Sequence, residues 1–135
     1  MTELEQLKYL QKDYRILYDA MTALTVSSFA AQERDLQVIL TDQTEFSLKT
    51  FGPGNNTAGI IDHIEKELNE IKENPADIME WIDVAILAFD GAFRNGYTPK
   101  EIVDAYRCKL EINKNRKWPD WRTATPGKAI EHLDE

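Results

Sequence analysis

Apolar residues along the chain recur at spacings of three and four, and no stretch alternates between apolar and polar positions with period two. The first spacing indicates α-helices, whereas the second would indicate strands. We therefore predict an all-α protein. The predicted helices span residues 3–25, 29–50, 57–73, 76–94 and 99–116, and a short terminal helix is predicted over 126–133.

Residues that start and stop helices set these boundaries. Asn74 is placed to cap a helix that has Pro75 in its first turn. Thr98 and Glu101 have the spacing of a capping box at the start of another helix. The segment 51–56, Phe-Gly-Pro-Gly-Asn-Asn, is the strongest loop signal in the chain.

The first predicted helix carries apolar residues at alternating spacings of three and four, the heptad pattern of helices that pack along one another. We call these residues the heptad seam: Leu7, Leu10, Tyr14, Leu17, Met21 and Leu24. The pattern fits packing onto the chain's own domain and packing against a partner subunit equally well. Because the residues with candidate chemistry begin well after it, we expect residues 1–27 to be an interface extension and residues 28–135 the main domain.

Two acidic pairs with i, i+3 spacing lie on consecutive predicted helices. Glu67 and Glu70 stand at the edge of an apolar helix face, where a carboxylate is costly unless something pairs with it. Glu80 and Asp83 lie on the polar stripe of the next helix, which is otherwise apolar. The short turn makes the two helices antiparallel, so the four acids can form a cage for Mg²⁺ or Mn²⁺. An ordinary solvent-facing stripe is the alternative interpretation of the second pair.

The last predicted helix carries donors for an anion. Its apolar stripe continues as Lys109, Asn113 and Arg116 at i, i+4 and i+7, which indicates side chains directed at a phosphate. Surface cations that favour a helix C-terminus are the alternative. Acids together with basic donors are the arrangement of a metal–phosphate site.

Composition narrows the partners and the compartment. The 135 residues include 16 basic and 24 acidic ones, a net charge of −8, so bulk nucleic-acid binding is not expected. The single cysteine, Cys108, excludes an internal disulfide and fits a reducing compartment. The N-terminus does not have the pattern of a signal peptide, and no apolar stretch reaches membrane-spanning length. We therefore expect a soluble cytoplasmic protein.

The ordered series of acids and donors resembles the signature of the MazG-like all-α nucleoside triphosphate pyrophosphohydrolases. The matching motifs are Glu67-x-x-Glu70, then Glu80-x-x-Asp83, then Lys109-x-x-x-Asn113-x-x-Arg116. Shorter segments resemble the phage-associated dATP/dGTP diphosphohydrolase branch, which includes the MazZ-like enzymes: Thr50-Phe51-Gly52-Pro53-Gly54, Asp62-His63-Ile64, Glu80-Trp81-Ile82-Asp83, Asp90-Gly91 and Trp118-Pro119-Asp120-Trp121-Arg122. The family's usual double glutamate is Lys66-Glu67 here, and the first 27 residues have no counterpart.

The resemblance implies a MazG-like helical bundle of four core helices, here with an extra N-terminal helix, that forms a dimer or a dimer of dimers. It also implies a Mg²⁺-dependent enzyme, with Mn²⁺ able to substitute, acting in the host cytoplasm if it is phage-encoded. The implied reaction cleaves a nucleoside triphosphate, expected to be dGTP or dATP, into the monophosphate and pyrophosphate.

The resemblance also assigns roles to individual residues. The expected metal ligands and catalytic residues are Glu67, Glu70, Glu80 and Asp83. The expected phosphate ligands are Lys109, Asn113 and Arg116. For the base, Phe46, Ser47 and Phe51 near the loop are candidates, and Trp81 is expected in the core rather than in the base pocket.

Two other functions are compatible with an acidic helical bundle. A di-iron carboxylate protein needs a Glu-x-x-His motif on each of two helices, and His63 and His132 do not supply one. A non-enzymatic interaction protein would bind its partner through the heptad seam. That second alternative predicts that the four acids are solvated and bind no metal.

Overall fold

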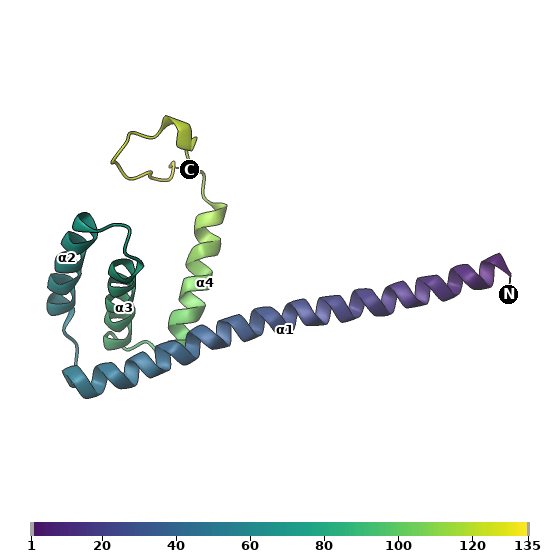
Figure 1. The fold of residues 1–135 in the computed structure, drawn as a ribbon, viewed down its shortest axis with the longest axis horizontal. Helices are drawn as coiled ribbons and strands as arrows, with labels where there is room; N and C mark the ends of the chain where they lie inside the picture. Colours follow the sequence, from purple (N-terminus) through teal and green to yellow (C-terminus); the bar gives the residue numbers. More distant parts are fainter. Residues whose placement is uncertain (1, 135) are drawn as a thin grey trace.

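The computed structural model describes residues 2–134, apart from the side chains of residues 9, 25–30 and 32. Its regular elements are helices α1 (Glu3–Phe51), α2 (Thr57–Glu73), α3 (Ile78–Arg94) and α4 (Pro99–Asn115), followed by a 3₁₀ turn, η1 (Trp121–Thr123). No residue in the described part of the chain lies in a strand, which confirms the predicted all-α class. Helices α2, α3 and α4 stand on one side of the C-terminal half of α1, whose N-terminal half extends away from them (Figure 1).

Helix α1 is continuous from Glu3 to Phe51, so the predicted break between residues 25 and 29 is wrong. The sequence there, Val26-Ser27-Ser28, contains no glycine or proline. Such residues lower helix stability relative to alanine by only about 0.7 kcal/mol or less each, which does not end a helix that is held in place at one end. The predicted boundary between residues 27 and 28 therefore lies inside a helix, and the division into an extension and a main domain stays a prediction.

The start of α3 also differs from the prediction. Asp77 is the N-cap, and its carboxylate accepts a hydrogen bond from the backbone N–H of Met79 at 2.9 Å. Asn74 instead caps the C-terminus of α2, and Pro75 lies in the turn between the helices. Aspartate and asparagine are both good caps, so the residue type alone did not decide between two candidates three positions apart.

The capping box predicted for α4 is confirmed, and the predicted terminal helix is wrong. Thr98 is the N-cap of α4. Its hydroxyl accepts a hydrogen bond from the backbone N–H of Glu101, and the Glu101 carboxylate accepts one from the backbone N–H of Thr98. Residues 126–133 form no helix, because the chain turns at Gly127 with a positive φ of 74°. That conformation is incompatible with a right-handed helix.

The apolar core of the single chain is small. Leu40 of α1 packs with Ile102 and Val103 of α4, and Leu36, Phe89, Ala92 and Phe93 surround them. Helix α3 contributes no buried residue, although its sequence is apolar on nearly all sides. Much apolar surface of α3 is therefore open in the single chain. Among the described residues, no helix combines the length and the apolar content that crossing a membrane requires.

Candidate active site

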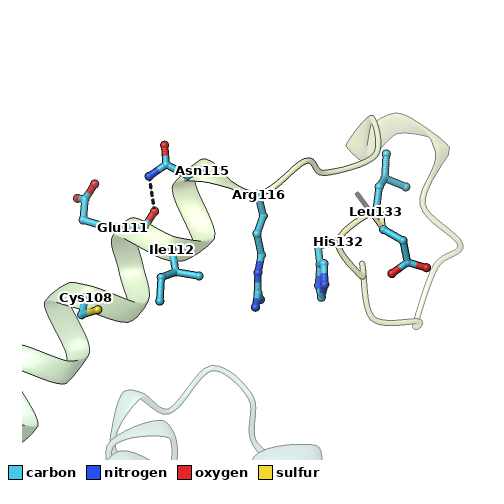
Figure 2. Close-up of a pocket in the computed structure, with 8 residues that line it drawn as sticks. Cys108, Glu111, Ile112, Asn115, Arg116, His132 and Leu133 are labelled. Carbon is cyan, nitrogen blue, oxygen red and sulfur yellow. Dashed lines mark hydrogen bonds between the residues drawn. The ribbon is translucent and has the colours of Figure 1, made fainter.

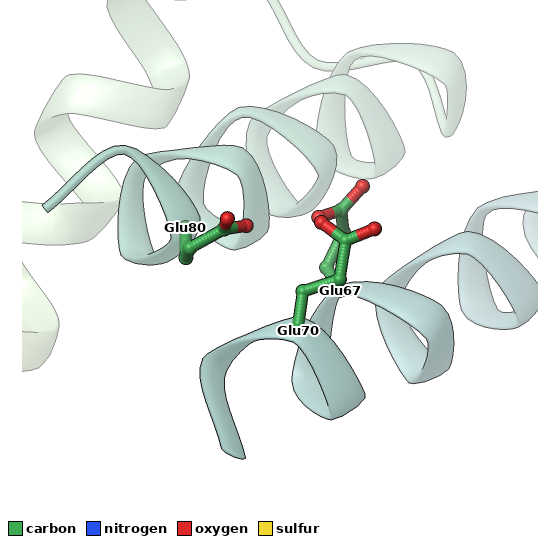
Figure 3. Close-up of side chains that lie close together, drawn as sticks. All are labelled: Glu67, Glu70 and Glu80. Carbon is green, nitrogen blue, oxygen red and sulfur yellow. The ribbon is translucent and has the colours of Figure 1, made fainter. Parts of the chain in front are cut away.

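The predicted acidic residues converge where α2 and α3 lie antiparallel, as the short turn between them predicted (Figure 1). Glu67 and Glu70 project from α2 and Glu80 from α3, and one carboxylate oxygen of each lies within 4.8 Å of the others (Figure 3). Asp83 follows Glu80 by one turn of α3 and lines the same cavity as Glu67. We call these four residues the acid cluster. The structure thus groups Glu67, Glu70 and Glu80 closely, and Asp83 lies near Glu67 without being part of that closest group.

Glu67 is the buried member of the acid cluster, with 9% of its surface exposed. Its Oε1 lies 3.0 Å from Nε2 of His63, one turn earlier on α2. Its Oε2 is buried and has no hydrogen-bond partner. A buried acceptor without a donor destabilises a fold unless something satisfies it, and a cation would do so. The solvated acids expected for an interaction protein are therefore contradicted at Glu67.

Repulsion within the acid cluster changes its proton affinity. Burial raises the pKa of Glu67, and the nearby charges of Glu70 and Asp83 raise it further, whereas His63 lowers it. The pKa of Glu80 is also raised, first by its close contact with the Glu70 carboxyl group and then by burial. Carboxylates this close disfavour one another's ionised form, and a divalent cation between them reverses that preference.

A cavity of about 400 Å³ lies beside the acid cluster. The end of α1, the loop 52–56 and the facing sides of α2 and α3 line this central cavity. Glu67 and Asp83 line it near the α2–α3 turn, and Phe46, Phe51 and the loop line it near the start of α2. Glu67 lies seven residues beyond Ile60, which is about 10 Å along a helix. The cavity therefore has an acidic end and an aromatic end.

The three residues predicted to bind phosphate lie on α4, and none of them lines the central cavity. Lys109 is exposed, and Arg116 donates a hydrogen bond to Oδ1 of Asn113 at 3.3 Å. Arg116 also lines a separate hollow of about 580 Å³ together with His132 (Figure 2). Their role as phosphate ligands stays a prediction.

The residues predicted to line or to lie near the base pocket occupy different positions in the structure. Phe46 and Phe51 both line the central cavity and form an edge-to-face pair with ring centroids 6.3 Å apart. Ser47 is 3% exposed and does not line the cavity. Its hydroxyl donates a hydrogen bond to Asp90 and accepts one from Arg94. Trp81 is 53% exposed, and its indole N–H donates to the carbonyl of Pro75, so the expected core position is wrong in the single chain.

Sequence reasoning had assigned no role to three ionisable residues of the cavity lining: His63, Asp90 and Arg94. Each of them belongs to a local sequence pattern that could have indicated its role. His63 precedes Glu67 by four residues, and Asp90 precedes Arg94 by four, which places each pair on one helix face. Asp90 and Arg94 also belong to the polar stripe of an otherwise apolar helix.

Comparisons with known proteins identify the family of the chain and similar proteins. A family model described as dATP/dGTP pyrophosphohydrolase matches residues 39–135. The chain is 37% identical over 62 residues to the Eaa protein of Salmonella phage P22, a match that covers 46% of this chain and only 20% of that relative.

Among solved structures, the fold is similar to the cyanophage S-2L MazG-like pyrophosphohydrolase, which was determined with dGDP and three catalytic Mn²⁺ ions per active site. The TM-score is 0.56 at 25% identity, covering 76% of this chain and 94% of that one. This chain therefore belongs to the dATP/dGTP pyrophosphohydrolase family and has a MazG-like all-α fold.

Proposed function

We propose that the enzyme hydrolyses a deoxypurine nucleoside triphosphate, dGTP or dATP, between its α and β phosphates and releases pyrophosphate. The observation that carries this proposal is the orphaned Oε2 of Glu67 among three further carboxylates, beside a cavity of about 400 Å³. Cavities of roughly 300–1,000 Å³ are the usual size for small-molecule sites. Family membership supports the class of reaction, and the acid cluster supports its place in the fold.

The acid cluster fits Mg²⁺ because Glu67, Glu70, Glu80 and Asp83 offer only carboxylate oxygens, which hard divalent cations prefer. Mn²⁺ has the same preference and is able to substitute. When bound, the metal lowers the pKa of coordinated water and neutralises charge that develops on the phosphate. His63 contacts Oε1 of Glu67 and leaves the buried Oε2 without a hydrogen-bond partner.

The two ends of the central cavity suit the two ends of a nucleotide. The triphosphate lies at the acidic end, and the purine lies against Phe46, Phe51 and Ile60 at the aromatic end. Lys109, Asn113 and Arg116 hold the outer phosphates. The C-terminal end of α4, which carries them, lies at the same end of the bundle as the α2–α3 turn, and this supports their role (Figure 1).

The enzyme acts as a homo-oligomer, a dimer or a dimer of dimers. Met79 and Ile82 of α3 are each more than 40% exposed in the single chain. A helix that is apolar on all sides is normally buried, so a second copy of the chain covers this face. Residues 1–27 extend the interface, and residues 28–135 form the catalytic domain.

A screen of the eight common ribo- and deoxyribonucleoside triphosphates with Mg²⁺ tests this function. Pyrophosphate and free phosphate are scored separately for each nucleotide. We expect dGTP or dATP to be hydrolysed fastest, with pyrophosphate as the product and with activity lost when the metal is chelated. Release of free phosphate alone, or hydrolysis that survives chelation, would contradict the proposal.

A further inference from the structure

Arg94, the last residue of α3, uses every hydrogen-bond donor that it has. Its side chain is only 5% exposed. Nε donates to Oδ2 of Asp90 at 2.9 Å, and Nη1 donates to the carbonyl oxygens of Gly52 at 3.0 Å and Gly54 at 2.8 Å. Nη2 donates to the carbonyl of Ser47 at 3.3 Å and to its Oγ at 2.8 Å. A guanidinium group has five N–H donors, so none is left for a phosphate.

The charge of Arg94 is likewise satisfied within the protein. Asp90, four residues earlier on α3, pairs with it through Oδ2 and accepts a 2.6 Å hydrogen bond from Ser47 Oγ on its other oxygen. Ser47, Asp90 and Arg94 thus form a closed network between α1 and α3. Although Arg94 lines the central cavity, its contacts are those of a residue that holds the wall in place.

The segment that Arg94 holds is the loop between α1 and α2. Gly52 and Gly54 have φ angles of +78° and +104°, a region that residues with a Cβ rarely adopt. Without a fixed partner, a loop with two glycines samples many conformations. The hydrogen bonds from Nη1 to both glycine carbonyls stabilise a single loop conformation. In this conformation Pro53 and Gly54 line the cavity.

A second contact from the same end of α3 ties down the next part of the loop. Nδ2 of Asn55 donates to Oδ1 of Asn95 at 2.9 Å, and Nδ2 of Asn95 donates back to the carbonyl of Gly91 at 2.8 Å. Asn55 also accepts hydrogen bonds from the backbone N–H and the hydroxyl of Thr57. Two adjacent residues, Arg94 and Asn95, therefore fix both halves of the loop against α3.

We propose that Arg94 is a positioning residue, which fixes the loop 52–56 as the wall against which the nucleobase binds. The inference rests on the proposed function, because it needs a nucleotide in the central cavity. Arg94 lies eleven residues beyond Asp83, about 16 Å along the helix, so its loss leaves the acid cluster intact. Loosening the wall weakens nucleotide binding and base discrimination, while metal binding and the rate of the chemical step are retained.

Arg94→Lys is the informative variant, since lysine keeps the positive charge beside Asp90 but cannot span the carbonyls of Gly52 and Gly54. Asn95→Ala removes the second tie from an exposed position. Arg107→Lys is the matched control, because Arg107 forms an exposed ion pair with Glu33 far from the loop. The readouts are KM and kcat for dGTP and dATP, the Mg²⁺-induced rise in Tm, and hydrogen exchange of the amides in residues 52–56.

For Arg94→Lys we expect a KM increase of at least ~10-fold, with kcat changed by less than ~3-fold and an unchanged metal response. Loop amides exchange faster, the preference between dGTP and dATP narrows, and Asn95→Ala shifts each quantity less in the same direction. Arg107→Lys matches the wild type.

Wild-type KM and wild-type loop exchange in Arg94→Lys would overturn the inference. So would a large loss of kcat and of the metal response with unchanged loop exchange, which would place Arg94 in the catalytic centre. If Arg94→Lys does not fold, Asn95→Ala decides by the same two readouts. Hydrogen exchange of the loop amides does not depend on turnover. Failure of the proposed function would appear as a wild type that hydrolyses no nucleotide, and is therefore distinguishable from failure of the inference about Arg94.

Discussion

The acid cluster and the N-terminal half of α1 depart from ordinary burial in opposite directions. In the acid cluster, a carboxylate that belongs in water is 9% exposed and has an unpaired oxygen. On α1, the leucines of the heptad seam, which belong in a core, are more than half exposed. Each arrangement is costly in the single chain, the first through lost hydration and the second through exposed apolar surface. The proposed function assigns a cation to the first region and a second copy of the chain to the second.

The two proposed ligands differ in chemistry, so the two regions can be tested separately. The acid cluster lies within a packed helix pair and is proposed to bind a cation, whereas the seam lies on the part of α1 that extends away from the other helices and is proposed to bind a second copy of the chain (Figure 1). If the comparison is sound, changing an acid alters the response to metal but not the oligomer mass. Changing the seam alters the mass but not the response to metal.

The largest expected effect comes from Glu80→Gln. Loss of a residue that only supports a metal ligand costs about 10–100-fold, so loss of a ligand should lower kcat/KM by at least ~100-fold. In the absence of metal the same variant should melt at a higher temperature than the wild type, because one repelling charge is gone. It should also lose most of the Mg²⁺-induced rise in Tm.

Thermal melts with and without Mg²⁺, together with steady-state kinetics, measure these changes. Glu65→Gln is the matched control, since Glu65 is an exposed glutamate on the neighbouring helix α2 and lies outside the acid cluster. An apo Glu80→Gln protein that still responds to metal like its parent would show that the cluster is not the metal site.

The next effect, on oligomer mass, tests the heptad seam. Leu17→Lys places a charge on the seam, and Ile16→Lys places the same charge on the same helix outside it, at similar exposures of 64% and 57%. Burying each seam side chain stabilises an interface by roughly 1.5–3 kcal/mol. We expect Leu17→Lys, and deletion of residues 1–26, to lower the mass or raise the dissociation constant, whereas Ile16→Lys changes neither.

Light scattering across a dilution series measures this effect, and the Mg²⁺-induced rise in Tm should survive in every variant. A truncated protein that keeps its mass at every concentration but melts much lower would assign the seam to packing within the subunit. The oligomer would then depend on α3 alone.

The smallest effect concerns pH. The folded state raises the pKa values of Glu67 and Glu80 above their ordinary value of 4.5, so folding takes up protons at these residues. Their contribution to stability is therefore greatest below pH 4.5 and is lost as the pH rises through the raised pKa values. The apo Glu67→Gln variant should gain Tm relative to the apo wild type as pH increases across that range.

Metal reverses this trend, because only the ionised carboxylates bind it. The Mg²⁺-induced rise in Tm of the wild type should grow with pH across the same range. Melts at a series of pH values, with and without Mg²⁺, measure both slopes. A difference between wild type and Glu67→Gln that does not vary with pH would mean that burial leaves the Glu67 proton affinity unchanged.

Local patterns in the sequence predicted much of the fold. The bounds of α2 and α4 followed from caps and from the loop at 51–56, and the spacing of the acids predicted the cluster between α2 and α3. The break in α1 and the start of α3 were wrong, because serine, asparagine and aspartate favour helix ends without requiring them. A glycine with a positive φ, such as Gly127, is incompatible with a continuing right-handed helix.

The rest of the site depends on contacts between distant parts of the chain. Arg94 reaches Ser47, Gly52 and Gly54 across 40 or more residues, and no local period encodes those bonds. Apolar periodicity also indicated which residues need burial without indicating what buries them. For this reason Trp81 was expected in the core but is exposed in the single chain.

The most direct test of the central claim, hydrolysis at the α-phosphorus beside the acid cluster, follows the oxygen of the attacking water. The enzyme is allowed to turn over its preferred nucleotide with Mg²⁺ in water enriched in heavy oxygen, and both products are analysed by mass spectrometry. Attack at the α-phosphorus puts the label in the nucleoside monophosphate and leaves the pyrophosphate unlabelled, which is the result we predict. Label in the pyrophosphate would show attack at the β-phosphorus and contradict the account.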